Sequence, residues 1–174
     1  EGKTSRDEKR VVENKKDELD ILNSEIKRAN DTIGIKKTFI YNFADNRFDS
    51  VDLLDIVKVI SKVKEEIRPD IIFTHYENDL NIDHKITYQA VITATRPMQN
   101  ESVKEIYSFE ILSSTEWNYP LSFSPDTFFD IEDTLDLKIS AMKEYKSELC
   151  LYPHPRSLEG IELNAHYHGM RAGN

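Results

Sequence analysis

Residues 75–84, HYENDLNIDH, concentrate histidine, carboxylate and amide side chains in one short stretch of the chain. The stretch directly follows PDIIFT (residues 69–74), an apolar run typical of a buried strand. Imidazoles and carboxylates bind metal ions and transfer protons. Because ligands of open α/β sheets collect beyond the carboxyl ends of the strands, these residues stand where a functional site is expected.

Two other polar stretches are expected at the same edge of the sheet. ADNRFDS (44–50) follows one predicted strand and SSTEWN (113–118) follows another. Together with residues 75–84 they bring charged and amide side chains to one rim: Asp45, Arg47, Asp79, Asn81, Asp83, His84 and Glu116.

Several non-catalytic interpretations compete for this stretch. Asp79, Asn81 and Asp83 alternate like the first ligands of a calcium loop. Such a loop needs Gly at the position of His84 and Glu at the position of Ala90. A calcium loop of that type is therefore excluded. Asp83 also suits the N-cap of a following helix, and His84 suits a helix start without any ligand role. His75, at the strand end, either lines the site or packs. A metal site made of His75, His84 and His154 is a further alternative.

The elements that position these residues follow from hydrophobic periodicity. Helices are predicted from about Val11 to Ile33 with Gly34 as the C-terminal cap, around Leu53–Ile67 ending at Pro69, and after His84 up to Pro97. Strands are predicted at Thr38–Phe43, Asp70–Thr74 and Val103–Ile111. Two more helices are expected over Leu135–Leu149 and from Leu158 to about Tyr167, after a long irregular segment.

This alternation predicts an α/β fold with a mostly parallel, Rossmann-like sheet and helices on both faces. At 174 residues, a single domain spanning residues 1–174 is expected.

The composition narrows the functional classes. The formal net charge of -9, with basic residues dispersed among acidic ones, argues against a nucleic-acid partner. No run reaches the roughly 18 apolar residues of a membrane span, so none is expected. The single cysteine, Cys150, fits a reducing, cytoplasmic setting. The sequence leaves the oligomeric state open, a homo-oligomer included.

Three segments resemble the PIG-L/LmbE-like zinc-dependent N-deacetylases. PDIIFTHYENDLNIDHKITYQAVITATRP is similar to a motif in which a strand ends in T-H-x-x-x-D-x-(H/N)-x-D-H and a helix follows. KISAMKEYKSELCLYPHPRSLEGIELNAHYHGMRAG is similar to the closing segment of the family with its H-P-R-S turn, and ADNRF resembles its D-x-R turn.

The resemblance implies roles for individual residues. His84 would be one ligand of a single zinc ion, and Asp83 would orient its imidazole. Asn81 stands where the family often has a second histidine that helps to stabilise the oxyanion; an amide can donate a hydrogen bond there but cannot protonate a leaving amine. The identity of the general acid therefore stays open.

The resemblance also implies the substrate class. The expected reaction is zinc-dependent hydrolysis of the acetamide of an N-acetylglucosamine-type small molecule, which releases acetate and a free amine. The residues expected to contact the sugar are Arg47, Asp79, His75, His154 and Arg156; ordinary ion pairing is the alternative for the two arginines, and shaping of the proline-rich turn is the alternative for His154.

The family's A-H-P-D-D-E motif, which supplies its other zinc ligands and its general base, does not occur in this sequence. We expect about 40 further residues upstream, one βαβ step, and a further element after GMRAG. The alternative function is a non-catalytic Rossmann-like module that binds a sugar or a nucleotide; the sequence has no glycine-rich phosphate fingerprint to support the nucleotide.

Overall fold

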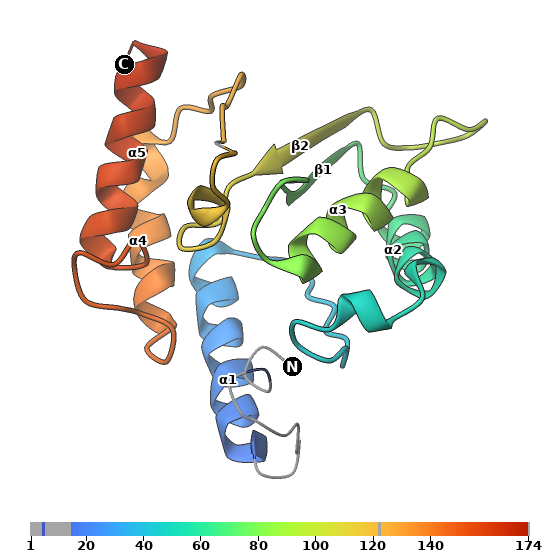
Figure 1. The fold of residues 1–174 in the computed structure, drawn as a ribbon, viewed down its shortest axis with the longest axis horizontal. Helices are drawn as coiled ribbons and strands as arrows, with labels where there is room; N and C mark the ends of the chain where they lie inside the picture. The colour runs from blue at the N-terminus through green and yellow to red at the C-terminus, as the bar shows by residue number, and fades with distance from the viewer. Residues whose placement is uncertain (1–4, 6–14, 122, 174) are drawn as a thin grey trace. The chain divides into compact units, whose positions relative to one another are not determined.

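The fold is described from a computed structural model, which covers residues 5, 15–121 and 123–173. Helices and strands alternate through the first part of the chain and helices fill the last part (Figure 1). The described residues form two compact units: unit 1 contains residues 39–121, and unit 2 contains residues 15–38 and 124–173. All of the strand-end residues of the predicted site belong to unit 1.

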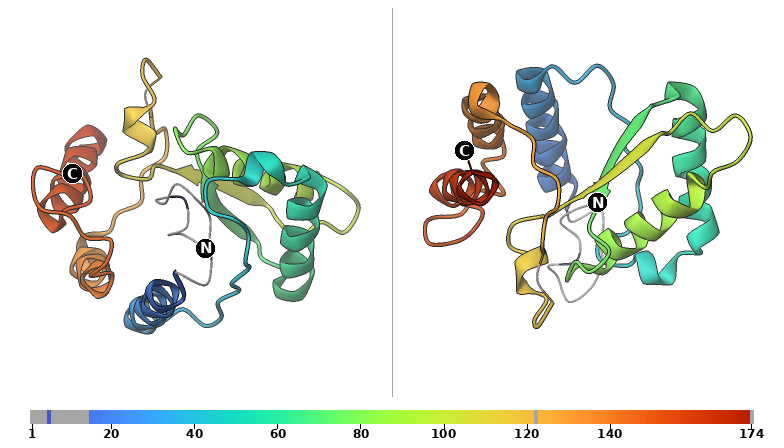
Figure 2. Two further views of the ribbon diagram at one scale, coloured as in Figure 1. Left: turned by 60° about the horizontal axis from the view of Figure 1, so that its bottom comes forward. Right: turned by 90° about the horizontal axis from the view of Figure 1, so that it is seen from above.

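Unit 1 is organised by two parallel strands, β1 (Ile71–His75) and β2 (Glu105–Phe109), which run side by side (Figure 2). Their register aligns Ile71 with Glu105 and His75 with Phe109. The helix α3 (Ile82–Ala94) connects them and packs on β1, while α2 (Leu53–Ile67) packs on α3. This β–α–β arrangement confirms the predicted α/β class and the parallel pairing.

The core of unit 1 lies between α2 and α3. Ile56, Val57 and Ala90 are buried there. Phe43 and Phe48 cover this cluster and contact each other edge to face, with ring centroids 5.3 Å apart. The middle of the apolar spacing of α2, at Ile56 and Ile60, packs in this core, whereas Leu53 and Ile67 near the helix ends are exposed.

The strand predicted at Thr38–Phe43 is wrong. These residues are described but adopt no strand, and the sheet of the described residues contains only β1 and β2. Ile40 is 58 % exposed and Tyr41 38 %. A β-rich sequence needs a neighbouring strand to satisfy its backbone groups, and no described segment pairs with this one.

Unit 2 contains the helices α1 (Lys16–Ile33), α4 (Leu135–Glu144) and α5 (Leu158–Ala172). Short 3-10 turns complete the described chain: η3 (Phe48–Ser50) and η4 (Thr115–Trp117) in unit 1, and η5 (Glu132–Thr134) in unit 2. Gly34 ends α1 in the left-handed conformation, as predicted. The predicted helix start at residues 11–14 lies outside the described residues.

Two predicted boundaries in unit 2 are corrected. The helix expected to reach Leu149 ends at Glu144. The buried carboxylate of Glu25 accepts hydrogen bonds from the backbone N–H and the hydroxyl of Ser147, at 3.0 and 2.6 Å, which holds the chain in a turn there. The last helix continues past Tyr167 to Ala172 because nothing in HYHGMRA interrupts it before Gly173, which caps it.

The proline-rich turn before α5 packs tightly on the first turn of that helix. Ser157 is its N-cap and accepts a hydrogen bond from the Gly160 N–H at 2.9 Å. A Cβ at Gly160 would lie 2.6 Å from the carbonyl oxygen of Pro155. The glycine therefore permits an approach that no side chain would allow.

Candidate active site

A cluster of polar side chains lies at the carboxyl ends of β1 and β2. It consists of His75, Asp79, His84, Ser114 and Thr115, and we call it the strand-end cluster. His75 is the last residue of β1, and Ser114 and Thr115 lie in the loop that follows β2. His84 stands in the first turn of α3. The structure thus brings the three predicted residues of this cluster together at the predicted edge of the sheet.

Asp79 is the centre of the cluster and is completely buried. Its carboxylate accepts hydrogen bonds from the Asn81 N–H at 2.8 Å, from the Thr115 hydroxyl at 2.6 Å and from the Ser114 hydroxyl. Burial alone would raise the pKa of Asp79, but the hydrogen bonds from Ser114, Thr115 and Asn81 outweigh it and, with His84 nearby, hold the pKa below its usual range. The side chain is therefore a carboxylate at neutral pH.

His84 faces that carboxylate. Its Nδ1 lies 3.0 Å from Asp79 Oδ1, and the side chain is 20 % exposed. Nδ1 itself is buried and has no well-aligned hydrogen bond among the described residues. The exposed part of the ring therefore comprises atoms other than Nδ1, and Asp79 is the charged group beside the buried nitrogen.

His75 stacks on His84. The ring centroids are 4.1 Å apart and the planes differ by 11°. Burial lowers the pKa of His75 to about 4, with a further contribution from His84 that Asp79 partly offsets, so His75 is neutral at pH 7. Phe109 contacts the same ring edge-on, with centroids 5.3 Å apart.

The parallel stacking decides whether the two histidines can share a metal ion. Zinc binds an imidazole nitrogen in the plane of the ring, at about 2.0–2.1 Å. An ion in the plane of one of these rings lies out of the plane of the other. His75 and His84 therefore cannot bind one ion together in this arrangement, which weighs against a site built from His75, His84 and His154.

Asn81, rather than Asp83, is the N-cap of α3. Its side-chain oxygen accepts a hydrogen bond from the Asp83 N–H at 2.8 Å. Asp83 instead accepts hydrogen bonds from the backbone N–H groups of Asn46, at 2.7 Å, and Phe48, at 3.0 Å. The capping role predicted for Asp83 thus belongs to Asn81. Asp83 instead joins the turn of residues 44–50, which carries the exposed Arg47, to the start of α3.

His154 and Arg156 lie in unit 2. His154 Nδ1 accepts a hydrogen bond from the Arg156 N–H at 3.1 Å. Arg156 Nη1 lies 3.2 Å from Glu148, an ion pair of the kind expected as the alternative to sugar binding. Their predicted contact with the substrate stays a prediction.

Ser114 and Thr115 were not predicted to belong to the site. Both are buried and donate to Asp79, and Thr115 Oγ1 also accepts from the Ile111 N–H at 2.7 Å. A second link joins the same two loops, because Asn118 Nδ2 donates to the Asn78 carbonyl at 2.7 Å. The only sequence signal for their role was the presence of hydroxyl side chains shortly after the strand predicted at Val103–Ile111.

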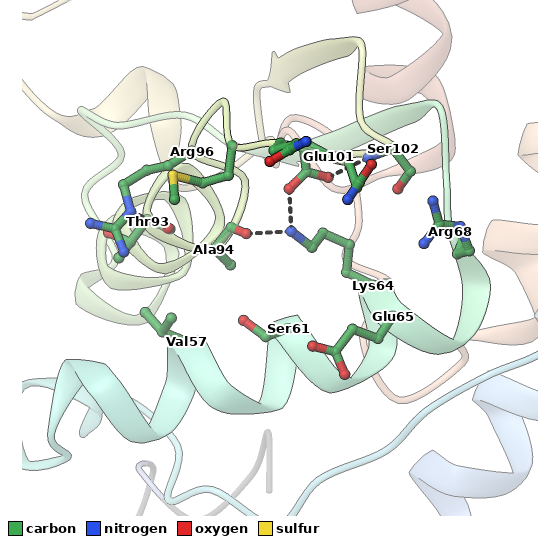
Figure 3. A pocket seen from close by; sticks show the side chains of 13 residues that line it. Val57, Ser61, Lys64, Glu65, Arg68, Thr93, Ala94, Arg96, Glu101 and Ser102 are labelled. Atoms are coloured by element: carbon green, nitrogen blue, oxygen red, sulfur yellow. Dashed lines mark hydrogen bonds and ion pairs between the residues drawn. The ribbon is translucent and has the colours of Figure 1, made fainter.

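A second charged cluster lies on the amino-terminal side of β2, in a surface pocket of about 320 Å³ (Figure 3). Lys64 of α2 donates to the Ala94 carbonyl at 2.6 Å and to the Glu101 carboxylate. Glu101 also accepts from the backbone N–H groups of Ser102, at 2.8 Å, and Val103, at 3.1 Å. We call these groups the Lys64–Glu101 cluster; each of its charges has an opposite charge or a backbone partner.

The residues of the strand-end cluster fit one ligand of a metal ion rather than a whole site. In residues 15–121 and 123–173, no three His, Cys, Asp or Glu side chains are placed to hold one ion. His84 nevertheless has the surroundings of a metal-binding histidine, because a buried carboxylate lies beside one nitrogen while part of the ring remains exposed. Within the described part of the chain, no helix is both long and apolar enough to cross a bilayer.

The fold and the site together place this chain among α/β proteins with a polar site at the edge of the sheet. The site lies at the end of a parallel β–α–β unit and contains a histidine beside a buried carboxylate. The sequence pattern of the PIG-L family, described as GlcNAc-PI de-N-acetylase, matches residues 1–95, more than half of the chain. The chain belongs to the PIG-L family.

Two further comparisons give a similar protein and a similar fold. The chain is 26 % identical over 141 residues to the probable N-acetyl-alpha-D-glucosaminyl L-malate deacetylase 2 of Bacillus cereus, covering 80 % of this chain and 63 % of that protein. The chain thus spans less than two thirds of that curated relative. Its fold is similar to the crystal structure of the conserved protein TT1542 from Thermus thermophilus, with a TM-score of 0.67 and 15 % identity over 88 % of this chain and 67 % of that one.

Proposed function

We propose that this protein is a zinc-dependent N-deacetylase, which hydrolyses the acetamide of an N-acetylglucosamine-type small molecule to acetate and a free amine. Membership of the PIG-L family and the similarity to a protein named as a probable N-acetylglucosaminyl malate deacetylase support the reaction class. A GlcNAc-type sugar is the substrate class that both names share.

The observation that carries the proposal is the environment of His84. Histidines that bind metals usually donate their second N–H to a carboxylate or carbonyl, which fixes the ring and raises its basicity. His84 Nδ1 is buried 3.0 Å from Asp79, and Asp79 is held by three donors of its own. His84 is accordingly the proposed zinc ligand of this chain.

A zinc ion bound there would lower the pKa of a water molecule and polarise the amide carbonyl. The side-chain oxygen of Asn81 is used by the helix cap, so the amide N–H group is the part of Asn81 that can stabilise negative charge on the carbonyl oxygen. The resemblance assigns the orientation of the imidazole to Asp83, although both of its oxygens accept from backbone N–H groups.

Substrate contacts are proposed for residues with accessible side chains. Arg47 is exposed on the turn fastened to α3, and a guanidinium presents several donors to sugar hydroxyls. His75, His154 and Arg156 keep their predicted assignments. The complete burial of Asp79 favours a role in orienting neighbours over the predicted contact with the substrate.

We also propose the finer architecture expected from the sequence: one deacetylase domain, residues 1–174, with a Rossmann-like sheet covered on both faces. The similarity to one solved chain over 88 % of this sequence supports a single domain. Phe73 and Tyr107 stack on each other across β1 and β2, and Phe73 is 56 % exposed within the described structure, as expected of a sheet face that further elements cover. The single cysteine supports the proposed cytoplasmic setting.

The test uses the protein encoded by the complete gene that contains this sequence. Zinc content and acetate release from N-acetylglucosaminides are measured for the parent, for His84→Ala and for His166→Ala, whose exposed histidine in α5 is a matched control. We expect His84→Ala to lose at least about 100-fold in zinc affinity and its turnover, and His166→Ala to retain both. Equal zinc content in the parent and His84→Ala would remove His84 from the proposed role.

A sugar-binding module without turnover is the competing outcome. It would show binding of the N-acetylglucosaminide without release of acetate at any zinc concentration. That result would contradict the proposed reaction, although the family assignment would stand.

A further inference from the structure

Two carboxylates compete for the role of orienting His84. Asp83 precedes His84 in the chain, but its two oxygens are engaged by the backbone N–H groups of Asn46 and Phe48. Asp79 is five positions away, and its Oδ1 lies 3.0 Å from His84 Nδ1, within hydrogen-bond distance although the two groups are not aligned as a hydrogen bond. Proximity in sequence and proximity in space therefore point to different residues.

We infer that Asp79 is the positioning residue of His84: its carboxylate accepts the Nδ1–H of the neutral imidazole and so leaves the lone pair on Nε2 for a ligand. The inference rests on the proposed function for the identity of that ligand, a zinc ion. The preference of the ring for one tautomer depends only on residues of this chain. A neutral imidazole has one N–H and one acceptor nitrogen, and the partner of one nitrogen decides the state of the other.

Burial makes Asp79 the partner that the ring can use. His84 Nδ1 is inaccessible to solvent, so water cannot satisfy it, and a buried N–H without an acceptor costs about 1–3 kcal/mol. The ring of His75 covers one face of His84, which limits the directions in which the imidazole can rotate away from Asp79. The acceptor is completely enclosed as well.

The orientation of Asp79 is set by the second loop of the site. The hydroxyls of Ser114 and Thr115 donate to its two oxygens, and the Asn81 N–H donates to Oδ1. The loop after β2 thereby fixes the carboxylate that faces a histidine of α3, although it makes no hydrogen bond to that histidine among the described residues. This connection extends the site to residues that an inspection of histidines and acids alone would omit.

The test reads the tautomer of His84 directly in the metal-free protein encoded by the complete gene that contains this sequence. The protein is labelled with 15N at histidine, and two-dimensional 1H–15N multiple-bond correlation spectra are recorded at a pH at which His84 is neutral. His84→Gln identifies its signals. The variants are Asp79→Ala, which removes the acceptor, Asp79→Asn, which keeps a neutral acceptor if Asp79→Ala fails to fold, and Asp83→Asn, which tests the competing carboxylate.

We expect the parent ring to carry its proton on Nδ1, and Asp83→Asn to keep this tautomer. Asp79→Ala should lose the preference, and Asp79→Asn should populate both tautomers. A parent that carries the proton on Nε2 would overturn the inference, as would a preference that survives in both Asp79 variants. Loss of the preference in Asp83→Asn with retention in Asp79→Asn would transfer the role to Asp83.

A zinc titration of the same samples separates this inference from the proposed function. Zinc that shifts Nε2 of His84 in the parent, and binds about 10–100-fold more weakly to the Asp79 variants, supports both. The tautomer spectra alone decide the inference, whereas activity and zinc content of the protein from the complete gene decide the proposed function. Either can therefore fail while the other holds.

Discussion

The strand-end cluster and the Lys64–Glu101 cluster lie at opposite ends of the β1–β2 pair and differ in how completely their polar groups are satisfied. Lys64 has a carbonyl and a carboxylate, and Glu101 has an ammonium and two backbone donors. In the strand-end cluster, Asp79 is equally well satisfied, but the buried Nδ1 atoms of His75 and His84 have no well-aligned partner among the described residues. Buried polar groups left in this condition are uncommon and require an explanation.

The difference separates two uses of charged side chains that are removed, wholly or partly, from solvent. A cluster whose groups all pair with one another can stabilise the fold and has little capacity left for a ligand. A cluster that fixes a carboxylate beside a partly exposed imidazole keeps capacity for a ligand on that ring. The predictions below are designed to separate stability from ligand binding at these two places.

The largest effect is expected for Asp79→Ala. It leaves the Asn81 N–H and the hydroxyls of Ser114 and Thr115 without their acceptor, so we expect a loss of about 3 kcal/mol in the free energy of unfolding, measured by urea denaturation. Lys64→Met in the other cluster should cost less, because Glu101 keeps two backbone donors. A larger loss in Lys64→Met would reverse the ranking of the clusters.

Thr115→Val removes one donor to Asp79 and the acceptor of the Ile111 N–H. We expect a loss of about 1.5 kcal/mol in the free energy of unfolding and a partial loss of the His84 tautomer preference in the same spectra. The exposed Thr127→Val is the control and should change neither quantity. An unchanged tautomer with a full loss of stability would show that Thr115 supports the fold without fixing Asp79.

Asn81→Ala should cost about 1 kcal/mol of stability through loss of the α3 cap. Asn81→Ser preserves a capping oxygen and should retain most of that stability, which makes it the matched variant for activity. If Asn81 also stabilises the oxyanion, Asn81→Ser should lose turnover despite its stable fold. Equal turnover of the parent and Asn81→Ser would restrict Asn81 to capping.

The smallest effect is a change in pH dependence at the Lys64–Glu101 cluster. The hydrogen bond from Lys64 is the main cause of a lowered pKa of Glu101 in the folded protein. The stabilisation linked to it is therefore present above the unfolded-state pKa, near 4.5, and disappears as the pH falls through the lower folded-state pKa. Glu101→Gln should flatten this acid limb of a stability–pH curve without altering the His84 spectra; an unchanged curve would contradict the role of the pair.

Helical periodicity predicted more of the fold than strand propensity did. The spacing of apolar residues located α2 and α3 because their buried faces are formed within unit 1. The segment Thr38–Phe43 has residues of high β propensity, but a strand also needs a partner, and propensity carries no information on pairing. The end of α4 depended on Glu25, more than a hundred residues away, whose contact with Ser147 has no local signature.

The sequence predicted several of the residues that gather at the strand ends but not which contacts they make there. The rule that ligands collect at strand ends identified the segment containing His75, Asp79 and His84. It could not distinguish Asp79 from Asp83, because both are acidic and both are close to His84 in sequence. The choice depends on Ser114 and Thr115, which reach Asp79 only through the parallel pairing of β1 and β2.

The contact at Gly160 has a consequence for the segment that carries His154 and Arg156. The backbone of that segment touches the first turn of α5 across a surface with no side chain between them. A methyl group at position 160 would push the proline-containing segment away from the helix. It would thereby displace His154 and Arg156 without changing either side chain. The spacing between the segment and α5 is thus held by the smallest residue of the chain.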